Sequence, residues 1–220
     1  MLINNSKGVF TAALAAMFVA LAVQAQTPAQ KPAQQPAQSS LAAAIDKAAA
    51  AAVARGESPG LQVAVFKDGK PVLVKGYGSA NLEQGVRVSN ESILRVGSVT
   101  KQFTATALLL LAEEGKLSTQ DKLSKYYPNF PRGNDITLEQ MLHHTSGIHS
   151  YTSDPSFEKE GMVHRSTEEM VDYIGKLSKT QDFEPGTDWS YSNSAFFILG
   201  GVIEKVSGES LAKVFKSRLF

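Results

Sequence analysis

The feature that most constrains the fold is a pair of apolar, valine-rich segments joined by a tight turn and followed by a long helical stretch. Residues 61–66 and 72–77 flank Asp68-Gly69, a dipeptide typical of two-residue β-hairpin turns. Pro71 lacks the N–H that an interior strand residue donates, so it suits the start of an edge strand. Because the strands precede a run of helices and do not alternate with them, their order predicts an α+β fold.

Helical patterns surround this hairpin. Residues 41–55 predict an alanine-rich helix closed by Gly56, and residues 98–114 predict an apolar helix closed by Gly115. Capping boxes and apolar periodicity predict further helices, at Thr137 with Gln140, at Ser166 with Glu169, over 193–206 and over 209–220. We therefore expect a helix and the first two strands in 41–97, forming an antiparallel sheet flanked by helices, and an all-helical part in 98–220.

The first 25 residues have the pattern of a secretory signal peptide. Lys7 supplies a positive charge, residues 9–23 are mainly apolar, and Val23 and Ala25 place small side chains at the −3 and −1 positions. The apolar run is shorter than the roughly 20 residues that span a bilayer, so we expect no stable membrane anchor. Residues 26–40 are rich in Pro, Gln and Ala and predict a disordered linker, with the folded part starting at residue 41. A periplasmic or secreted location follows from the signal.

Composition excludes several classes of function. The chain has 22 Lys plus Arg against 21 Asp plus Glu, a net charge of +1, which gives no electrostatic reason to expect a nucleic acid partner. It has no cysteine, so disulfides, cysteine nucleophiles and thiolate metal sites are excluded. His143, His144 and His149 cluster, but their spacing does not match a metal-ligand pattern. We expect neither a metal nor another cofactor.

Ser98 and Lys101 form the first candidate catalytic pair. Residues three apart on a helix share a face, so the Lys101 ammonium can reach the Ser98 hydroxyl. A serine hydroxyl needs a base before it is a good nucleophile, and a helix N-terminus with apolar surroundings disfavours the charged form of a lysine. The same spacing recurs in a polar loop and at the start of an amphipathic helix, where we expect structural roles only: Ser156 with Lys159, and Ser210 with Lys213.

Tyr191 and Asn193 form the second candidate pair. Residues two apart in an extended segment point the same way, so both side chains can face one cavity. A phenol whose pKa is lowered by an ammonium can act as a general base or acid, and an asparagine amide can bind a substrate amide. Asn193 also precedes an apolar helix, so an N-cap is an alternative role. Tyr127 and Asn129 have the same spacing, so spacing alone does not decide the assignment.

Four sequence blocks together resemble a known family. In order they are VKGYGSANLE, ILRVGSVTKQFTATALLLLAEEGKLS, LEQMLHHTSGI and FEPGTDWSYSN. They are similar to the serine β-lactamase and penicillin-binding-protein-like family, which includes class C β-lactamases, D-alanyl-D-alanine carboxypeptidases and related esterases. The resemblance covers residues 41–220 and implies a β-lactamase/transpeptidase-like fold. It also implies that Ser98 is the acylated nucleophile, Lys101 its activating partner, Tyr191 a proton shuttle and Asn193 a substrate-binding residue.

One motif of the family has no counterpart in the chain. The family carries Lys-Thr-Gly or His-x-Gly on a later strand, and no such motif follows Tyr191. We therefore expect a truncated domain that lacks the C-terminal strands. The resemblance implies a secreted serine hydrolase that acts through an acyl-enzyme on a β-lactam, a D-Ala-D-Ala peptide or a small ester. The alternatives are a module that captures penicillin or peptidoglycan peptide without turnover, and an inactive truncated product.

Overall fold

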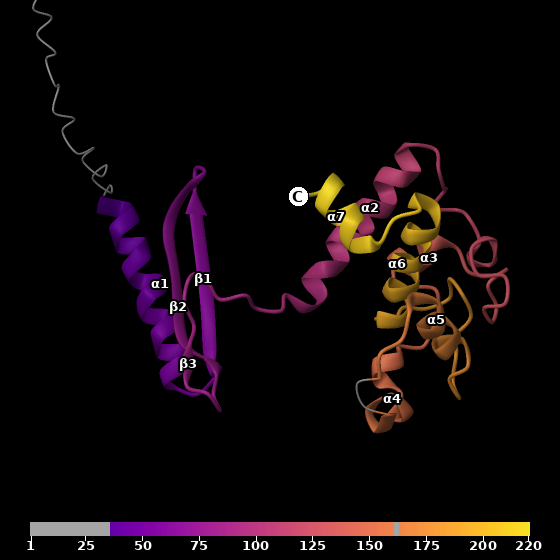
Figure 1. The fold of residues 1–220 in the computed structure, drawn as a ribbon. Coiled ribbons are helices and arrows are strands. Elements are labelled where there is room, and N and C mark those ends of the chain that lie inside the picture. The colour runs from indigo at the N-terminus through magenta and orange to yellow at the C-terminus, as the bar shows by residue number, and fades with distance from the viewer. Residues whose placement is uncertain (1–35, 161–162) are drawn as a thin grey trace, which may run out of the picture. The chain divides into compact units, whose positions relative to one another are not determined.

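The computed structural model describes residues 36–160 and 163–220 (Figure 1). The expected signal peptide, 1–25, and most of the expected linker, 26–40, lie outside the described residues. The chain divides into two compact units, with the boundary between Ile93 and Leu94. Within the described ranges, no helix has the length and apolar character needed to cross a bilayer.

The first unit is a three-stranded antiparallel sheet with one helix packed along it (Figure 1). Its elements are α1 (Pro36–Ala54), β1 (Gly60–Lys67), β2 (Lys70–Asn81) and β3 (Val86–Arg87), with strand order β1-β2-β3. The predicted hairpin is confirmed: Asp68 and Gly69 have φ values of 51° and 70°, the left-handed conformation that a two-residue turn between twisted strands requires.

Helix α1 differs from the prediction at its start. It begins at Pro36, so residues 36–40, which the sequence placed in the linker, are helical. Proline is tolerated in the first turn of a helix, and the alanines that follow have the highest helix propensity. Asp46 of α1 accepts hydrogen bonds from Lys75 Nζ at 2.6 Å and Tyr77 OH at 2.7 Å, which link the helix to β2.

In the described part of the second unit, the regular elements are helices and 3₁₀ turns joined by loops (Figure 1). Its core lies between α2 and α6, which contribute the fully buried side chains Leu108, Leu111, Ile198 and Leu199. Its elements are the 3₁₀ turns η1 (Gly97–Val99), η2 (Leu123–Lys125) and η3 (Tyr151–Ser153), and the helices α2 (Thr100–Glu113), α3 (Leu138–Leu142), α4 (Pro155–Glu160), α5 (Thr167–Gly175), α6 (Asn193–Ser207) and α7 (Leu211–Arg218).

Local signals in the sequence set the ends of these helices. Both predicted capping boxes are present, at the start of α3 with Thr137 and at the start of α5 with Ser166. Gly208 follows α6 with φ 71°, a left-handed C-terminal residue that favours glycine. An antiparallel sheet followed in sequence by a helical unit confirms the predicted α+β class.

Candidate active site

Ser98 lies in a 3₁₀ turn immediately before α2, one turn ahead of Lys101. The helix was predicted to start at Ser98, but regular α-helix starts at Thr100, and Gly97 enters the turn with φ 52°. Side chains three apart nearly eclipse one another in such a turn. Lys101 Nζ accordingly donates a hydrogen bond to Ser98 Oγ at 3.3 Å. The buried face of α2 anchors this end of the helix in the core.

Tyr191 and Asn193 flank the start of α6. Ser192 is the N-cap: its Oγ accepts a hydrogen bond from the backbone N–H of Ala195 at 3.1 Å. The alternative role of Asn193 as the cap is therefore wrong, and its side chain is free for other contacts. The Tyr191 hydroxyl lies 2.6 Å from Ser98 Oγ, although 93 residues separate the two in sequence. The fold thus brings the two predicted pairs into one site.

The Lys101 ammonium lies at the centre of this site. Besides Ser98, it donates a hydrogen bond to Asn193 Oδ1 at 2.7 Å, and it lies 4.7 Å from the centroid of the Tyr191 ring. Burial raises the pKa of the Tyr191 phenol, but hydrogen bonds with Lys101 and Ser98 and the positive charge of Lys101 outweigh burial. The pKa of Tyr191 consequently lies below its ordinary value. A nearby cation stabilises a phenolate, so the phenol is suited to accept a proton.

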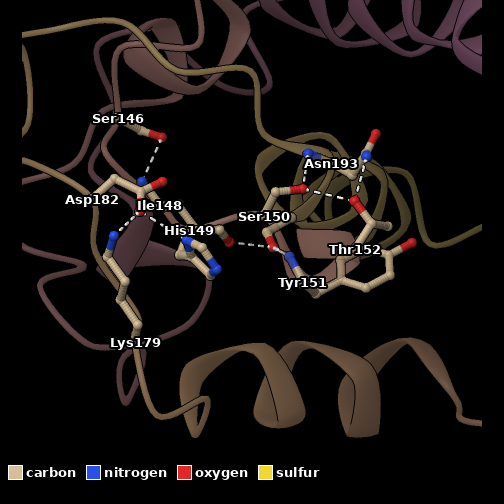
Figure 2. Close-up of polar contacts among 10 residues, drawn as sticks. Ser146, Ile148, His149, Ser150, Tyr151, Thr152, Lys179, Asp182 and Asn193 are labelled. Atoms are coloured by element: carbon tan, nitrogen blue, oxygen red, sulfur yellow. Dashed lines mark hydrogen bonds and ion pairs between the residues drawn. The ribbon is translucent and has the colours of Figure 1, made fainter. Parts of the chain in front are cut away.

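A network of hydroxyl groups orients Asn193 from the other side (Figure 2). Asn193 Nδ2 donates to Thr152 Oγ1 at 2.8 Å, and the backbone N–H of Asn193 donates to Ser150 Oγ at 3.1 Å. The two hydroxyls lie 3.0 Å from each other. Because Lys101 holds the amide oxygen and Thr152 holds the amide nitrogen, the amide plane is fixed in one orientation.

The segment that carries these hydroxyls is itself held in place at both ends. On one side, Ser194 Oγ accepts from the backbone N–H of Tyr151 at 2.8 Å and donates to the carbonyl of His149 at 2.6 Å. On the other side, the His149 ring lies 2.8 Å from Asp182, which also forms an ion pair with Lys179 at 2.7 Å (Figure 2). Segment 149–152 is therefore tied to α6 and to the loop that contains Asp182.

Three of the four candidate residues line a cavity of about 430 Å³, within the range of small-molecule sites, and Tyr191 is not among its lining residues. These three are Ser98, Lys101 and Asn193. Phe196 contributes an aromatic wall, and the cavity continues along α6 to Glu204. The arrangement offers a serine nucleophile beside a space that has both polar and apolar walls.

Comparison with known proteins identifies the family. Residues 45–220 match the Beta-lactamase family. This chain is a member of that family. The putative penicillin-binding protein PbpX of Bacillus subtilis (strain 168) is 33% identical over 156 residues, which are 71% of this chain and 37% of the relative.

Two solved structures of similar fold carry hydrolase names. D-amino acid amidase from Ochrobactrum anthropi SV3 has a TM-score of 0.71 and 26% identity, over 81% of this chain and 48% of that chain. D-stereospecific amidohydrolase from Streptomyces sp. has a TM-score of 0.65 and 35% identity, over 81% and 53%. The chain therefore spans 37% of the length of one curated relative and about half of these two solved chains.

The other serine–lysine and tyrosine–asparagine pairs with the same sequence spacing lie outside the site in this β-lactamase-family chain, and their side chains have structural contacts. Ser156 Oγ donates to Asp154 at 2.6 Å, and Ser210 caps α7 through the backbone N–H of Lys213. Tyr127, which shares the spacing of Tyr191, is buried in the core. The three histidines that are close in sequence have different surroundings in the structure. His143 is exposed, His144 packs against Tyr191, and His149 pairs with Asp182.

Sequence reasoning missed the contacts of three residues with the candidate groups: His144 packs against the Tyr191 ring, and Ser150 and Thr152 accept hydrogen bonds from Asn193. All lie about 40 to 50 residues before their partners in the chain, so no local spacing connects them. The one signal was the block LEQMLHHTSGI, which contains His144 and ends just before Ser150. The block indicated the family, and its contact with the site became visible only in the structure.

Proposed function

We propose that this protein is an exported serine hydrolase that forms an acyl-enzyme on Ser98. One observation carries the proposal: Ser98 Oγ lies 2.6 Å from the Tyr191 hydroxyl and 3.3 Å from Lys101 Nζ. A serine hydroxyl between a phenol of lowered pKa and an ammonium has both a proton acceptor and a charge that stabilises the acceptor's anion. Membership of the Beta-lactamase family and the hydrolase names of its structural neighbours support the same chemistry.

The proposed reaction has two halves. Tyr191, as the phenolate stabilised by Lys101, takes the proton of Ser98 while Ser98 Oγ attacks the substrate carbonyl carbon. The C–N or C–O bond to the leaving group then breaks, and Tyr191 returns the proton to that group. In the second half, water attacks the acyl carbon while Tyr191 takes its proton; the bond from that carbon to Ser98 Oγ then breaks, and Tyr191 returns the proton to Ser98 Oγ as the acid product leaves. No cofactor takes part in these steps.

We propose an amide, peptide, β-lactam or ester of a small acyl group as the substrate. The Asn193 amide retains hydrogen-bonding capacity after its bonds to Lys101 and Thr152, because its NH₂ has two donors and its oxygen two lone pairs. It can therefore bind an amide on the acyl side of the substrate. The names of the neighbours, a D-amino acid amidase and a D-stereospecific amidohydrolase, favour an acyl group of D configuration.

Covalent labelling tests the proposal directly. The protein, expressed from its complete gene, is incubated with a fluorescent penicillin and with an activated ester, and the labelled peptide is mapped by mass spectrometry. We expect the label on Ser98 and its loss in Ser98→Ala. Ser156→Ala is the matched control, because Ser156 has the same spacing to a lysine but lies outside the site. Undiminished labelling of Ser98→Ala would refute the assignment.

Turnover separates a hydrolase from a capture module. A hydrolase releases product continuously after the first equivalent, whereas a module that only captures its ligand stops after one equivalent per protein. Export is tested separately by N-terminal sequencing of the mature protein, for which we expect Gln26 as the first residue. A mature protein that retains residues 1–25 contradicts cleavage of a signal peptide.

A further inference from the structure

We propose that His144 is a positioning residue, which holds the Tyr191 phenol against Ser98 by binding the backbone on both sides of Tyr191. The inference rests on the proposed function, because it assumes that Tyr191 transfers the proton of Ser98. It assigns a task to a side chain that belongs to the turn after α3 and does not itself touch Ser98.

Two hydrogen bonds place His144 around Tyr191. The backbone N–H of Ser190, just before Tyr191, donates to the carbonyl of His144 at 3.0 Å. The backbone N–H of Ser192, just after it, donates to His144 Nδ1 at 3.1 Å. One residue thus satisfies both amides that flank the phenol, and fixing these amides fixes the direction in which the Tyr191 side chain leaves the chain.

The imidazole also forms the packing surface for the phenol ring. Its centroid lies 4.6 Å from that of Tyr191 with the planes tilted by 35°, and 5.0 Å from that of Phe196. Trp189 contacts it edge-on at 6.0 Å. The backbone of His144 has φ 60°, an uncommon conformation for a residue other than glycine, and such strained positions concentrate at functional sites.

Only the neutral imidazole can perform this task. An Nδ1 that accepts an amide N–H carries no proton, so protonation would place an N–H against the N–H of Ser192. The titratable groups that face the ring are the Lys101 ammonium, from α2, and the Tyr191 phenol, from the loop before α6; His143, its neighbour in the turn, is exposed. Burial and the charge of Lys101 lower the pKa of His144, which keeps the ring neutral to lower pH.

Two substitutions separate the hydrogen bond from the ring. His144→Phe keeps an aromatic ring but removes the acceptor at Nδ1. His144→Asn removes the ring but places an amide oxygen near the position of Nδ1, and asparagine tolerates positive φ. His143→Phe, at the exposed neighbouring position, is the matched control. The readout is the rate of Ser98 acylation by the activated ester, in protein expressed from its complete gene.

At about pH 8, where an ordinary histidine with a pKa of about 6.5 is neutral, we expect His144→Phe to acylate about 10- to 100-fold more slowly than the parent, because a desolvated N–H is left without an acceptor. We expect His144→Asn to recover most of that loss and His143→Phe to match the parent. As the pH falls from about 6.5 through the lowered pKa of His144, the ratio of the His144→Asn rate to the parent rate should rise, because the imidazole becomes protonated and asparagine does not titrate. Taking the ratio removes the pH effects that the two proteins have in common.

Three results would overturn the inference: a parental rate in His144→Phe, an equal loss in the Asn and Phe variants, or a rate ratio that does not change with pH. If His144→Phe fails to fold, the inference is tested by the His144→Asn variant alone, through its acylation rate and through the change with pH of the ratio of that rate to the parent rate. Failure of the proposed function gives a different result, because the parent protein would then carry no label on Ser98 in the first place.

Discussion

Replacing Ser194 by alanine should destabilise the helical unit by about 2–3 kcal/mol, because one hydroxyl satisfies two backbone groups. Ser194 is fully buried, and its Oγ accepts from the N–H of Tyr151 and donates to the carbonyl of His149. Leaving a buried donor or acceptor unpaired costs about 1–3 kcal/mol, and the lower half of that range applies to each of these partly buried groups. Alanine returns roughly 0.5 kcal/mol through its higher helix propensity.

Urea denaturation measures this loss. With a slope of about 1–3 kcal/mol per M, the midpoint should fall by about 1 M while the slope stays unchanged. Ser217→Ala is the matched control, since Ser217 is an exposed serine on a helix of the same unit and its loss should change stability by less than about 0.5 kcal/mol. A Ser194→Ala midpoint equal to that of Ser217→Ala would refute the reasoning that the hydroxyl holds segment 149–152 on α6.

Three further changes have defined outcomes. Thr152→Val removes the acceptor that orients the Asn193 amide and should slow acylation about 5- to 10-fold, whereas Thr152→Ser should not; equal rates in the two variants contradict this role. Gly201→Ala places a methyl group against the Tyr127 hydroxyl and should cost about 1–3 kcal/mol in thermal or urea unfolding; a parental melting temperature would show that the contact relaxes. Burial raises the pKa of Asp182, but hydrogen bonds from its lysine and histidine partners outweigh it and hold the pKa below the ordinary value. The parent should therefore exceed Asp182→Asn in stability above about pH 4, and the difference should vanish as the pH falls through the lowered pKa; a difference that persists in acid speaks against the ionised pair.

The elements that the sequence predicted correctly are those with a local physical signal. Asp68-Gly69 supplies the positive φ values of the hairpin turn, and the capping boxes at Thr137 and Ser166 satisfy N–H groups within one turn of helix. The predicted start of α1, at residue 41, was wrong. The prolines and glutamines of residues 26–40 were interpreted as a linker, whereas residues 36–40 form the first part of the alanine-rich helix.

The candidate site was predictable only in part for a related reason. Ser98 and Lys101 lie one helical turn apart, so their proximity followed from spacing. The contact between Tyr191 and Ser98 came from the resemblance of four sequence blocks, since spacing says nothing about two hydroxyls 93 residues apart. His144 and Thr152 act through backbone amides and a side-chain amide, and such contacts depend on how turns pack, which periodicity does not encode.

The distance along the chain between Ser98 and Tyr191 also has a consequence for biosynthesis. A ribosome adds about 5–20 residues per second, so the 93 residues that separate the two hydroxyls take about 5–20 s to synthesise. During that interval a nascent chain carries the serine without its proton acceptor. On the proposed mechanism, an unfinished chain that ends before Tyr191 can neither cleave a substrate nor be acylated by an inhibitor, so reactivity appears only when both parts of the helical unit have met.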